Sequence, residues 1–147
     1  MREVDETGLK FVELWEGFSP VIYLDIAGLP TIGIGHLILK GEIFNEPISH
    51  EEAYEILDRD MDIAERGVNT LITVPLSDLQ FDALVSFTFN VGVFALKGST
   101  ARSRLNRGEY ADAADALLYW IYAGGKQSKG LIHRRAAERG MFLEGTE

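Results

Sequence analysis

The chain has 147 residues, enough for one domain with a buried core, and its 46% hydrophobic and 25% charged residues are ordinary for a globular protein. It contains no cysteine, which excludes disulfide bonds and thiolate chemistry. The formal net charge of −9 argues against a nucleic acid partner, because such binding depends on positive potential.

The charge is unevenly divided along the chain. Residues 1–75 hold 5 Lys/Arg and 15 Asp/Glu, a balance of −10, whereas residues 76–147 hold 9 and 8, a balance of +1. An anionic polymer would therefore be held by the second half. The N-terminal residues include several acids and no long apolar run, so we expect no ordinary signal peptide and no membrane insertion.

The first elements that the sequence predicts are a helix and a β-hairpin. Apolar residues recur at helical spacing over 7–16, so Glu16 ends a short amphipathic helix. The segment 21–24 is β-rich, and a turn containing Gly and Pro follows. "TIGIGHLI", over 31–38, is expected to return as the second strand.

Helices account for the remainder of the prediction. Ser49 and Glu52 form a capping box that opens a helix over about 50–72, and Ser77 begins a second box. The segment "FDALVSFTFNVG" is apolar on nearly all sides, which predicts a central buried helix. Further helices are expected over 99–106, 110–123 and 131–143.

This order of elements predicts an α+β fold in a single domain covering 1–147. A small N-terminal hairpin lobe, about 13–60, is joined by the long helix, about 50–72, to a mainly helical C-terminal lobe, about 75–147. A cleft between lobes is the expected place for a site.

Two carboxylates and a hydroxyl near the hairpin suggest glycoside hydrolysis. That reaction needs one acid that donates a proton and one carboxylate that activates water or attacks the sugar. Glu16 lies beside Trp15 and Phe18, which would favour its protonated form, whereas Asp25 is expected on a solvated turn opposite Thr31. Because the chain has 23 acidic residues, the same spacing is also compatible with solvated surface acids.

Local sequence around these residues resembles a known family. "WEGF", the spacing Glu16-x8-Asp25-x5-Thr31 and "TIGIGHL" are similar to the catalytic signature of the phage-type lysozymes. The resemblance continues through "DRDMDIAERG", "ALVSFTFNVG" and "GLIHRR", and therefore covers nearly the whole chain.

The resemblance implies a muramidase that hydrolyses the β-1,4 bond between N-acetylmuramic acid and N-acetylglucosamine in bacterial peptidoglycan. It implies that Glu16 is the general acid, Asp25 the second carboxylate and Thr31 the residue that positions water. The family is described as inverting, with Asp25 as a base. Leu37 and Phe89 match positions that border the saccharide cleft, although both are also compatible with a core role.

The resemblance also implies a monomeric endolysin without cofactor or metal, present in the host cytoplasm until it is released to the periplasm and cell wall. Two alternatives remain open. One is a peptidoglycan-binding module without activity, and the other is a lysozyme domain of a phage tail or a bacterial effector.

Other polar residues have structural interpretations. We expect His36 to pair with an acid of the long helix, such as Asp60. The aspartates within 58–62 resemble calcium ligands, but the Gly and Glu that such a loop needs are missing. The alternating Gly33 and Gly35 permit a close approach of backbone or sugar. Arg134 or Arg135 could pair with Glu16, or lie on an exposed helix face.

Overall fold

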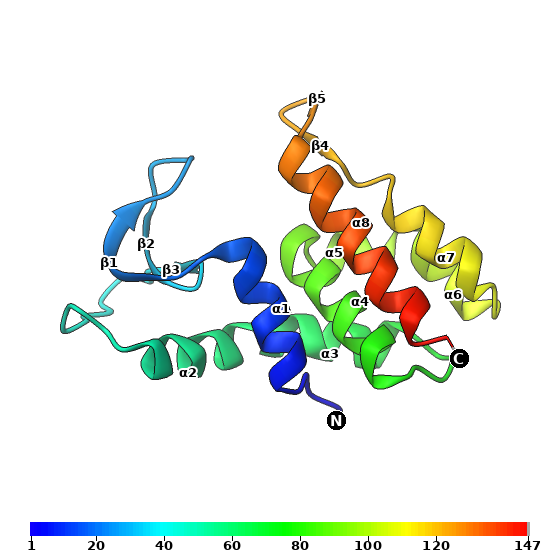
Figure 1. Cartoon of the computed structure of the whole chain (residues 1–147), viewed down its shortest axis with the longest axis horizontal. Coiled ribbons are helices and arrows are strands. Elements are labelled where there is room, and N and C mark those ends of the chain that lie inside the picture. The colour runs from blue at the N-terminus through cyan, green and yellow to red at the C-terminus, as the bar shows by residue number, and fades with distance from the viewer. Residues whose placement is uncertain (147) are drawn as a thin grey trace. The chain divides into compact units, whose positions relative to one another are not determined.

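The computed structural model describes residues 1–146, which form two compact units (Figure 1). The hairpin unit comprises residues 9–62, and the helical unit comprises residues 1–8 with the chain from Ile63 onward. Across residues 1–146, no helix is both long and apolar enough to cross a membrane.

The hairpin unit combines two helices with a small sheet. It contains most of α1 (Glu6–Glu16), then β1 (Ser19–Leu24), β2 (Pro30–Gly33), β3 (His36–Leu37) and α2 (His50–Asp60). The strands form an antiparallel sheet in the order β1-β2-β3. Its buried core is built from aliphatic side chains of α1, β2, the β2–β3 turn, α2 and the loop that precedes α2, namely Val12, Ile32, Ile34, Ile48, Ala53 and Leu57.

The sheet has one more strand than the sequence predicted. The segment expected to return as one strand is divided by a turn into β2 and β3. Gly33, the last residue of β2, and Gly35 have φ of +68° and +67°, left-handed values that do not allow an extended strand to continue. The alternating glycines therefore create a second tight turn.

The long helix predicted over 50–72 is two helices in the structure. The capping box of Ser49 and Glu52 is confirmed at the start of α2, and α3 (Asp62–Leu71) follows after Met61. Met61 itself has right-handed angles, φ −71° and ψ −16°, and its N–H donates to the carbonyl of Leu57 at 2.9 Å. The interruption is thus one residue rather than a loop.

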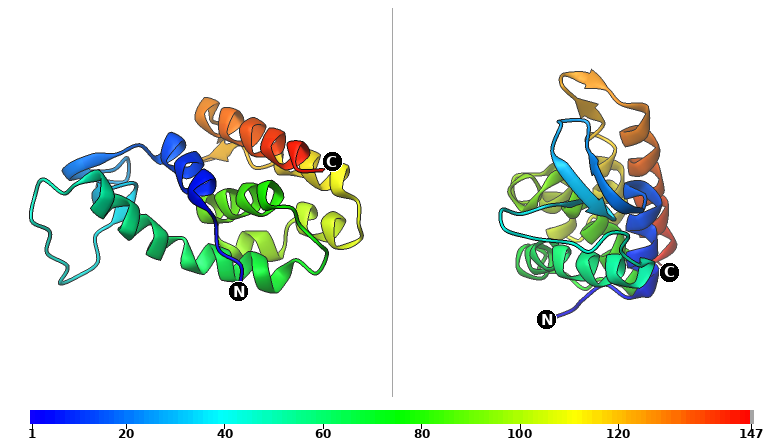
Figure 2. Two further views of the ribbon diagram at one scale, coloured as in Figure 1. Left: turned by 60° about the horizontal axis from the view of Figure 1, so that its bottom comes forward. Right: turned by 90° about the vertical axis from the view of Figure 1, so that its left-hand side faces the viewer.

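The helical unit is organised around α4 (Asp78–Val91), which lies beside α8 (Lys129–Glu144) (Figures 1 and 2). The predicted capping box of Ser77 and Gln80 opens α4, and every residue from Gln80 to Thr88 is buried. The prediction of a central buried helix is therefore confirmed. The remaining helices are α5 (Val93–Lys97), α6 (Thr100–Asn106) and α7 (Tyr110–Leu117).

Two segments of this unit differ from the prediction. Helix α5 was not expected, and α7 ends at Leu117 rather than at residue 123. Tyr122–Ala123 (β4) and Lys126–Gln127 (β5) instead form a hairpin. Gly124 and Gly125 have φ of +58° and +80°, as a two-residue hairpin turn requires. The Gly-Gly pair after an aromatic, β-branched segment was a readable signal for this hairpin.

Buried charges connect α8 to α4. Arg134 and Arg135 both pair with Glu138, and Glu138 Oε2 accepts a hydrogen bond from Ser86 Oγ at 2.7 Å. Arg135 also donates to the carbonyl of Trp120 at 2.9 Å. Both arginines are buried, so the interpretation of exposed helix arginines is wrong; charge buried in this way is retained only with such pairing.

Candidate active site

Glu16 is the last residue of α1, and a neighbouring acid fixes the end of that helix. Glu13, one turn earlier, accepts hydrogen bonds from the Tyr54 hydroxyl and from His50 Nε2, the latter at 2.5 Å. Burial of Glu13 opposes its ionisation, but these two partners outweigh that effect and lower its pKa. Gly17 closes the helix with φ of +76° and an N–H that donates to the carbonyl of Glu13. The backbone of Glu16 is thereby held against α2.

The side chain of Glu16 packs against a glycine of the β2–β3 turn. A Cβ placed on Gly35 would lie 2.7 Å from Glu16 Oε1, which is closer than real Cβ atoms approach, and 3.3 Å from Glu16 Cβ, which is a tight contact. The sequence predicted a close approach of backbone or sugar at the alternating glycines; at Gly35 the group that approaches is instead the side chain of Glu16.

Asp25 is held in the turn between β1 and β2. Its Oδ1 accepts the N–H of Leu29 at 2.8 Å, its own N–H donates to the Leu29 carbonyl at 3.0 Å, and its carbonyl accepts the N–H of Gly28. This is the self-bonded turn that Asp favours. The hydrogen bonds orient the carboxylate while the second oxygen, Oδ2, lies outside the turn's own bonding.

Thr31 stands on β2 and is only 2% exposed. Its Oγ1 donates to the carbonyl of Leu29 at 2.9 Å, so the same residue fixes both Thr31 and Asp25. Because the hydroxyl proton is used in this bond, the remaining capacity of Oγ1 is that of an acceptor.

Three side chains form a row across the sheet. Tyr23 pairs with Thr31 in the register of β1 and β2, and Thr31 pairs with Leu37 in the register of β2 and β3. Directly opposed residues of antiparallel strands project from the same face. Thr31 is thus flanked by Tyr23 and Leu37, which are 37% and 48% exposed.

The sequence analysis missed Tyr23, whose pKa is affected by both Glu16 and Asp25. Burial raises the pKa of its phenol, and the negative charges of Glu16 and Asp25 raise it further. Its place on the strand, two residues before Asp25, was the only available signal.

Phe89 is the one predicted site residue outside the hairpin unit. It lies half-buried on α4 in the helical unit. The structure therefore gathers Glu16, Asp25, Thr31 and Leu37 in one compact unit, and Phe89 belongs to the other.

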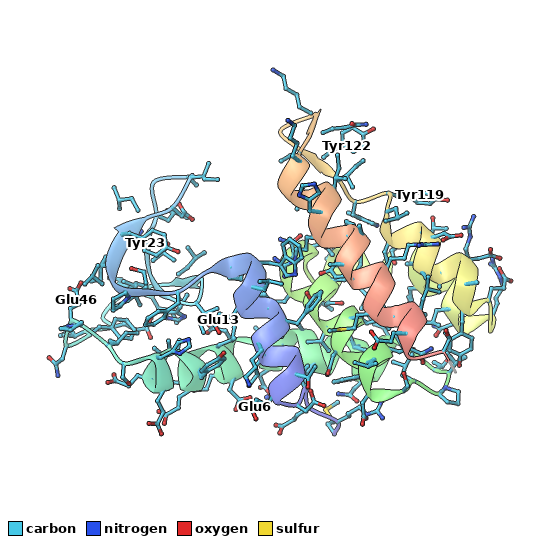
Figure 3. The ribbon with its side chains drawn as sticks, viewed as in Figure 1. Glu6, Glu13, Tyr23, Glu46, Tyr119 and Tyr122 are labelled. Carbon is cyan, nitrogen blue, oxygen red and sulfur yellow. The ribbon has the colours of Figure 1, made fainter. Side chains whose placement is uncertain are left out.

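The helical unit has a pocket of its own that the sequence analysis did not predict. Its volume is about 450 Å³, and Tyr119, Trp120 and Tyr122 line it with residues 98–100. Figure 3 shows Tyr122 at β4 and Tyr119 just after α7. The two tyrosines are 56% and 59% exposed, and the Trp120 ring packs edge-on against Phe87 with centroids 6.0 Å apart.

His36 has a structural pairing, as predicted. Its Nδ1 lies 2.7 Å from Asp60 Oδ2, which confirms the expected partner, and its Nε2 lies 2.9 Å from Glu42 Oε1. Burial alone would lower the pKa of His36, but hydrogen bonds to Glu42 and Asp60 raise it. Glu42 was missed because it lies in the irregular segment between β3 and α2, where no periodic pattern gives its position.

Acidic side chains do not converge on a candidate metal centre anywhere in residues 1–146. In particular, the aspartates of 58–62 are divided between α2 and α3, and Asp60 is bound to His36.

A helical protein with a small antiparallel sheet, in which a helix-end Glu and a turn Asp share one unit, has the architecture of lysozymes. The phage lysozyme family model matches residues 13–138. The chain therefore belongs to the phage lysozyme family, and it is a hydrolase of the muramidase class acting on peptidoglycan.

Individual relatives agree with this assignment. The chain is 36% identical to the endolysin of Salmonella phage P22 over 149 residues, covering 97% of this chain and 99% of that protein. A crystal structure of a P22 lysozyme mutant superposes with a TM-score of 0.88 at 37% identity, over 97% of this chain and 99% of that one. The muramidase domain of SpmX from Asticaccaulis excentricus gives a TM-score of 0.86 at 31% identity, with coverage of 97% and 99%.

Proposed function

We propose that this protein is an endolysin that hydrolyses the β-1,4 bond between N-acetylmuramic acid and N-acetylglucosamine. In this proposal Glu16 gives a proton to the leaving oxygen, Asp25 is the second carboxylate, and Thr31 positions the water. The reaction inverts the anomeric centre, with Asp25 acting as general base.

The observation that carries the proposal is that Leu29 hydrogen-bonds both Asp25 and Thr31, which fixes the proposed second carboxylate and the proposed water-positioning hydroxyl to one residue, in the same unit as Glu16. The raised pKa of Tyr23 agrees with this arrangement, because the charges of Glu16 and Asp25 both contribute to it. Glycoside hydrolysis needs two carboxyl groups on either side of one bond. Glu16, at the end of α1, and Asp25, in the β1–β2 turn, supply two such groups within one unit.

The hydrogen bonds of Thr31 support its role with water. Because Oγ1 donates to the Leu29 carbonyl, a water bound there must donate its own proton to Thr31. A water that also donates to Asp25 has its oxygen lone pairs left for the sugar, which is the orientation a nucleophile needs.

Leu37 and Phe89 are the proposed substrate contacts. Leu37 extends the row beyond Thr31 with an exposed aliphatic side chain in the hairpin unit, and Phe89 is a half-buried aromatic residue of α4 in the helical unit. The pocket at Tyr119 and Tyr122 combines aromatic faces with backbone groups, a surface on which pyranose rings stack.

The expected setting is the cytoplasm of a bacterial host, followed by release to the periplasm and cell wall, with the protein acting as a monomer on glycan strands. The muramidase domain of SpmX has a similar fold, which keeps two alternatives open. One is an effector or structural lysozyme domain, and the other is an inactive peptidoglycan-binding module. The experiment must distinguish both from an active endolysin.

The test is hydrolysis of purified peptidoglycan by the wild type, Glu16→Gln and Asp25→Asn. Glu51→Gln, which changes an exposed acid at the start of α2, is the matched control. We expect new reducing ends with the wild type and the control, and a loss of at least about 100-fold in both site variants. An active Glu16→Gln enzyme would refute the acid assignment. Binding without hydrolysis by the wild type would favour the inactive module.

The stereochemistry is tested separately. Proton NMR of the first product formed should show the α-anomer if water attacks directly, whereas a β-anomer would assign Asp25 as a covalent nucleophile.

A further inference from the structure

We propose that His50 and Tyr54, two aromatic residues in the first turns of α2, are positioning residues for Glu16, because their contacts hold the chain on both sides of the proposed acid. This inference rests on the proposed function, since α2 takes part in the reaction only through the place that it gives to Glu16. All the residues involved belong to the hairpin unit.

The chain before Glu16 is held through the side chain of Glu13. Its Oε1 accepts a hydrogen bond from the Tyr54 hydroxyl, and its Oε2 accepts one from His50 Nε2 at 2.5 Å. Both oxygens of the carboxylate are therefore bonded to α2, and hydrogen bonds to an ionised acceptor are stronger than neutral ones. The carbonyl of Glu13 in turn accepts the N–H of Gly17 at 2.8 Å, so the last turn of α1, which contains Glu16, starts from a residue that α2 holds.

The chain after the proposed acid is held by the same imidazole. The ring of Phe18 packs against the ring of His50 with centroids 4.7 Å apart, and the Tyr54 ring lies 4.8 Å from that of His50. Two residues beyond Phe18, the carbonyl of Pro20 accepts the N–H of Ile48 at 2.9 Å, from the loop that leads into α2. The start of α2 and its loop therefore contact the chain both before and after the acid.

The side chain of Glu16 is limited by a different segment. Because a Cβ on Gly35 would lie 2.7 Å from Glu16 Oε1, the β2–β3 turn borders the carboxyl group. Contacts with α2 thus fix the backbone that carries Glu16, and the turn limits where its carboxyl group can lie. The His50 side chain is 51% exposed, and exposed ion pairs add little to the stability of a fold. The effect expected of these contacts is therefore local order at the end of α1.

The first test measures peptidoglycan hydrolysis by variants that each remove one contact. His50→Gln keeps an N–H donor for Glu13 but removes the ring that packs against Phe18, whereas Tyr54→Phe keeps its ring and removes the hydroxyl. A displacement near 1 Å in a catalytic group can cost about 100-fold in rate, and partial loosening costs less. We expect kcat to fall about 3-fold in each single variant and about 10-fold in the double variant, with KM changing less than about 2-fold.

His133→Gln is the matched control, because it changes an exposed histidine of α8 in the helical unit. It should keep the kcat and KM of the wild type. A double variant of His50 and Tyr54 whose kcat equals that of the wild type would overturn the proposal. A raised KM with unchanged kcat would overturn it as well, because the two residues would then contact substrate rather than position the acid.

A second measurement does not depend on activity. The Gly17 amide, bonded to the Glu13 carbonyl, should exchange with deuterium about 10-fold faster in the double variant, because the end of α1 opens more often. Gly92, whose N–H donates to the Thr88 carbonyl at 2.7 Å where α4 ends in the helical unit, is the internal reference. An unchanged ratio of the two exchange rates would overturn the proposal. If the wild type hydrolysed no peptidoglycan, the proposed function would fail, whereas this ratio would still report whether α2 holds the end of α1.

Discussion

Replacing Gly35 with alanine tests the packing that places the proposed acid. An added Cβ would lie 2.7 Å from Glu16 Oε1, whereas ordinary contacts begin at 3.4 Å, so the carboxyl oxygen must move by about 0.7 Å. The atom that must move is the end of a flexible side chain, so most of the effect should fall on the position of the carboxyl group rather than on the fold.

The size of the effect follows from that displacement. A shift near 1 Å in a catalytic group can cost about 100-fold in rate, so we expect kcat to fall between about 10-fold and 100-fold. Alanine must also adopt φ of +67°, which costs about 1–2 kcal/mol of stability.

Gly33→Ala is the matched control for that strain. Gly33 has nearly the same angle, φ of +68°, but its nearest atoms would lie at 3.5 Å, in ordinary contact with Ala53 and Ile48. Both variants should therefore lose a similar amount of free energy of unfolding, measured by urea denaturation, while only Gly35→Ala loses kcat in a peptidoglycan turbidity assay. Equal loss of kcat in the two variants would refute the reasoning, because strain alone would then explain it.

Three further predictions concern charge and substrate. The pKa of His36 is raised in the folded protein, so its contribution to stability is present below about pH 6.5 and is lost as pH rises through the folded-state pKa. The difference in melting temperature between the wild type and His36→Asn should therefore shrink as pH rises over that range. A difference that stays constant with pH would contradict the pairing. Burial and a hydrogen bond with Asp5 raise the pKa of Asp82 to about 8, so stability from this group is lost between about pH 4 and pH 8, by up to roughly 1.4 kcal/mol per pH unit. Asp82→Asn should remove that slope in urea titrations and be more stable than the wild type at pH 9; an unchanged slope would show that Asp82 is ionised in the folded protein. Tyr122→Ala should raise KM for glycan strands by about 3-fold to 10-fold and change kcat little. Phe94→Ala, which changes an exposed aromatic residue outside the pocket, should leave KM unchanged. Equal KM values for the two variants would exclude the pocket as a substrate contact.

The Asp82 prediction also explains an unpaired buried atom. Asp82 is 3% exposed, and its Oδ2 has no partner if both aspartates are treated as acceptors. A proton on Asp82 resolves this, because Oδ2 can then donate to Asp5, whose own pKa is lowered chiefly by that hydrogen bond. The first turn of α1 is thereby fixed to α4 within the helical unit.

Local patterns in the sequence were sufficient for most elements. Both capping boxes and the buried α4 were predicted, because each depends on residues within four positions of one another. The third strand, the split at Met61 and the β4–β5 hairpin were not. In each of these places a local turn of the backbone interrupts a longer periodic pattern. At Gly33 and Gly35 the positive φ angles, which glycine adopts readily, produce the turn.

The candidate site was predicted in its residues but not in its support. Glu16, Asp25 and Thr31 were named from spacing and resemblance, yet the parts that hold them are non-local. Leu29 bonds both Asp25 and Thr31, which neither periodicity nor residue type predicts. Tyr23 became visible only through the strand register.

A choice between two acids on one helix shows what the structure adds. Glu13 and Glu16 lie one turn apart on α1, and composition alone gives either of them a carboxyl group for the reaction. Glu13 is bound by Tyr54 and His50, and these partners lower its pKa, so it is an anion at neutral pH and has no proton to donate. Its hydrogen bonds instead fix the helix end one turn before Glu16. The hydrogen bonds of Glu13 therefore help to hold in place the backbone of Glu16, the proposed general acid.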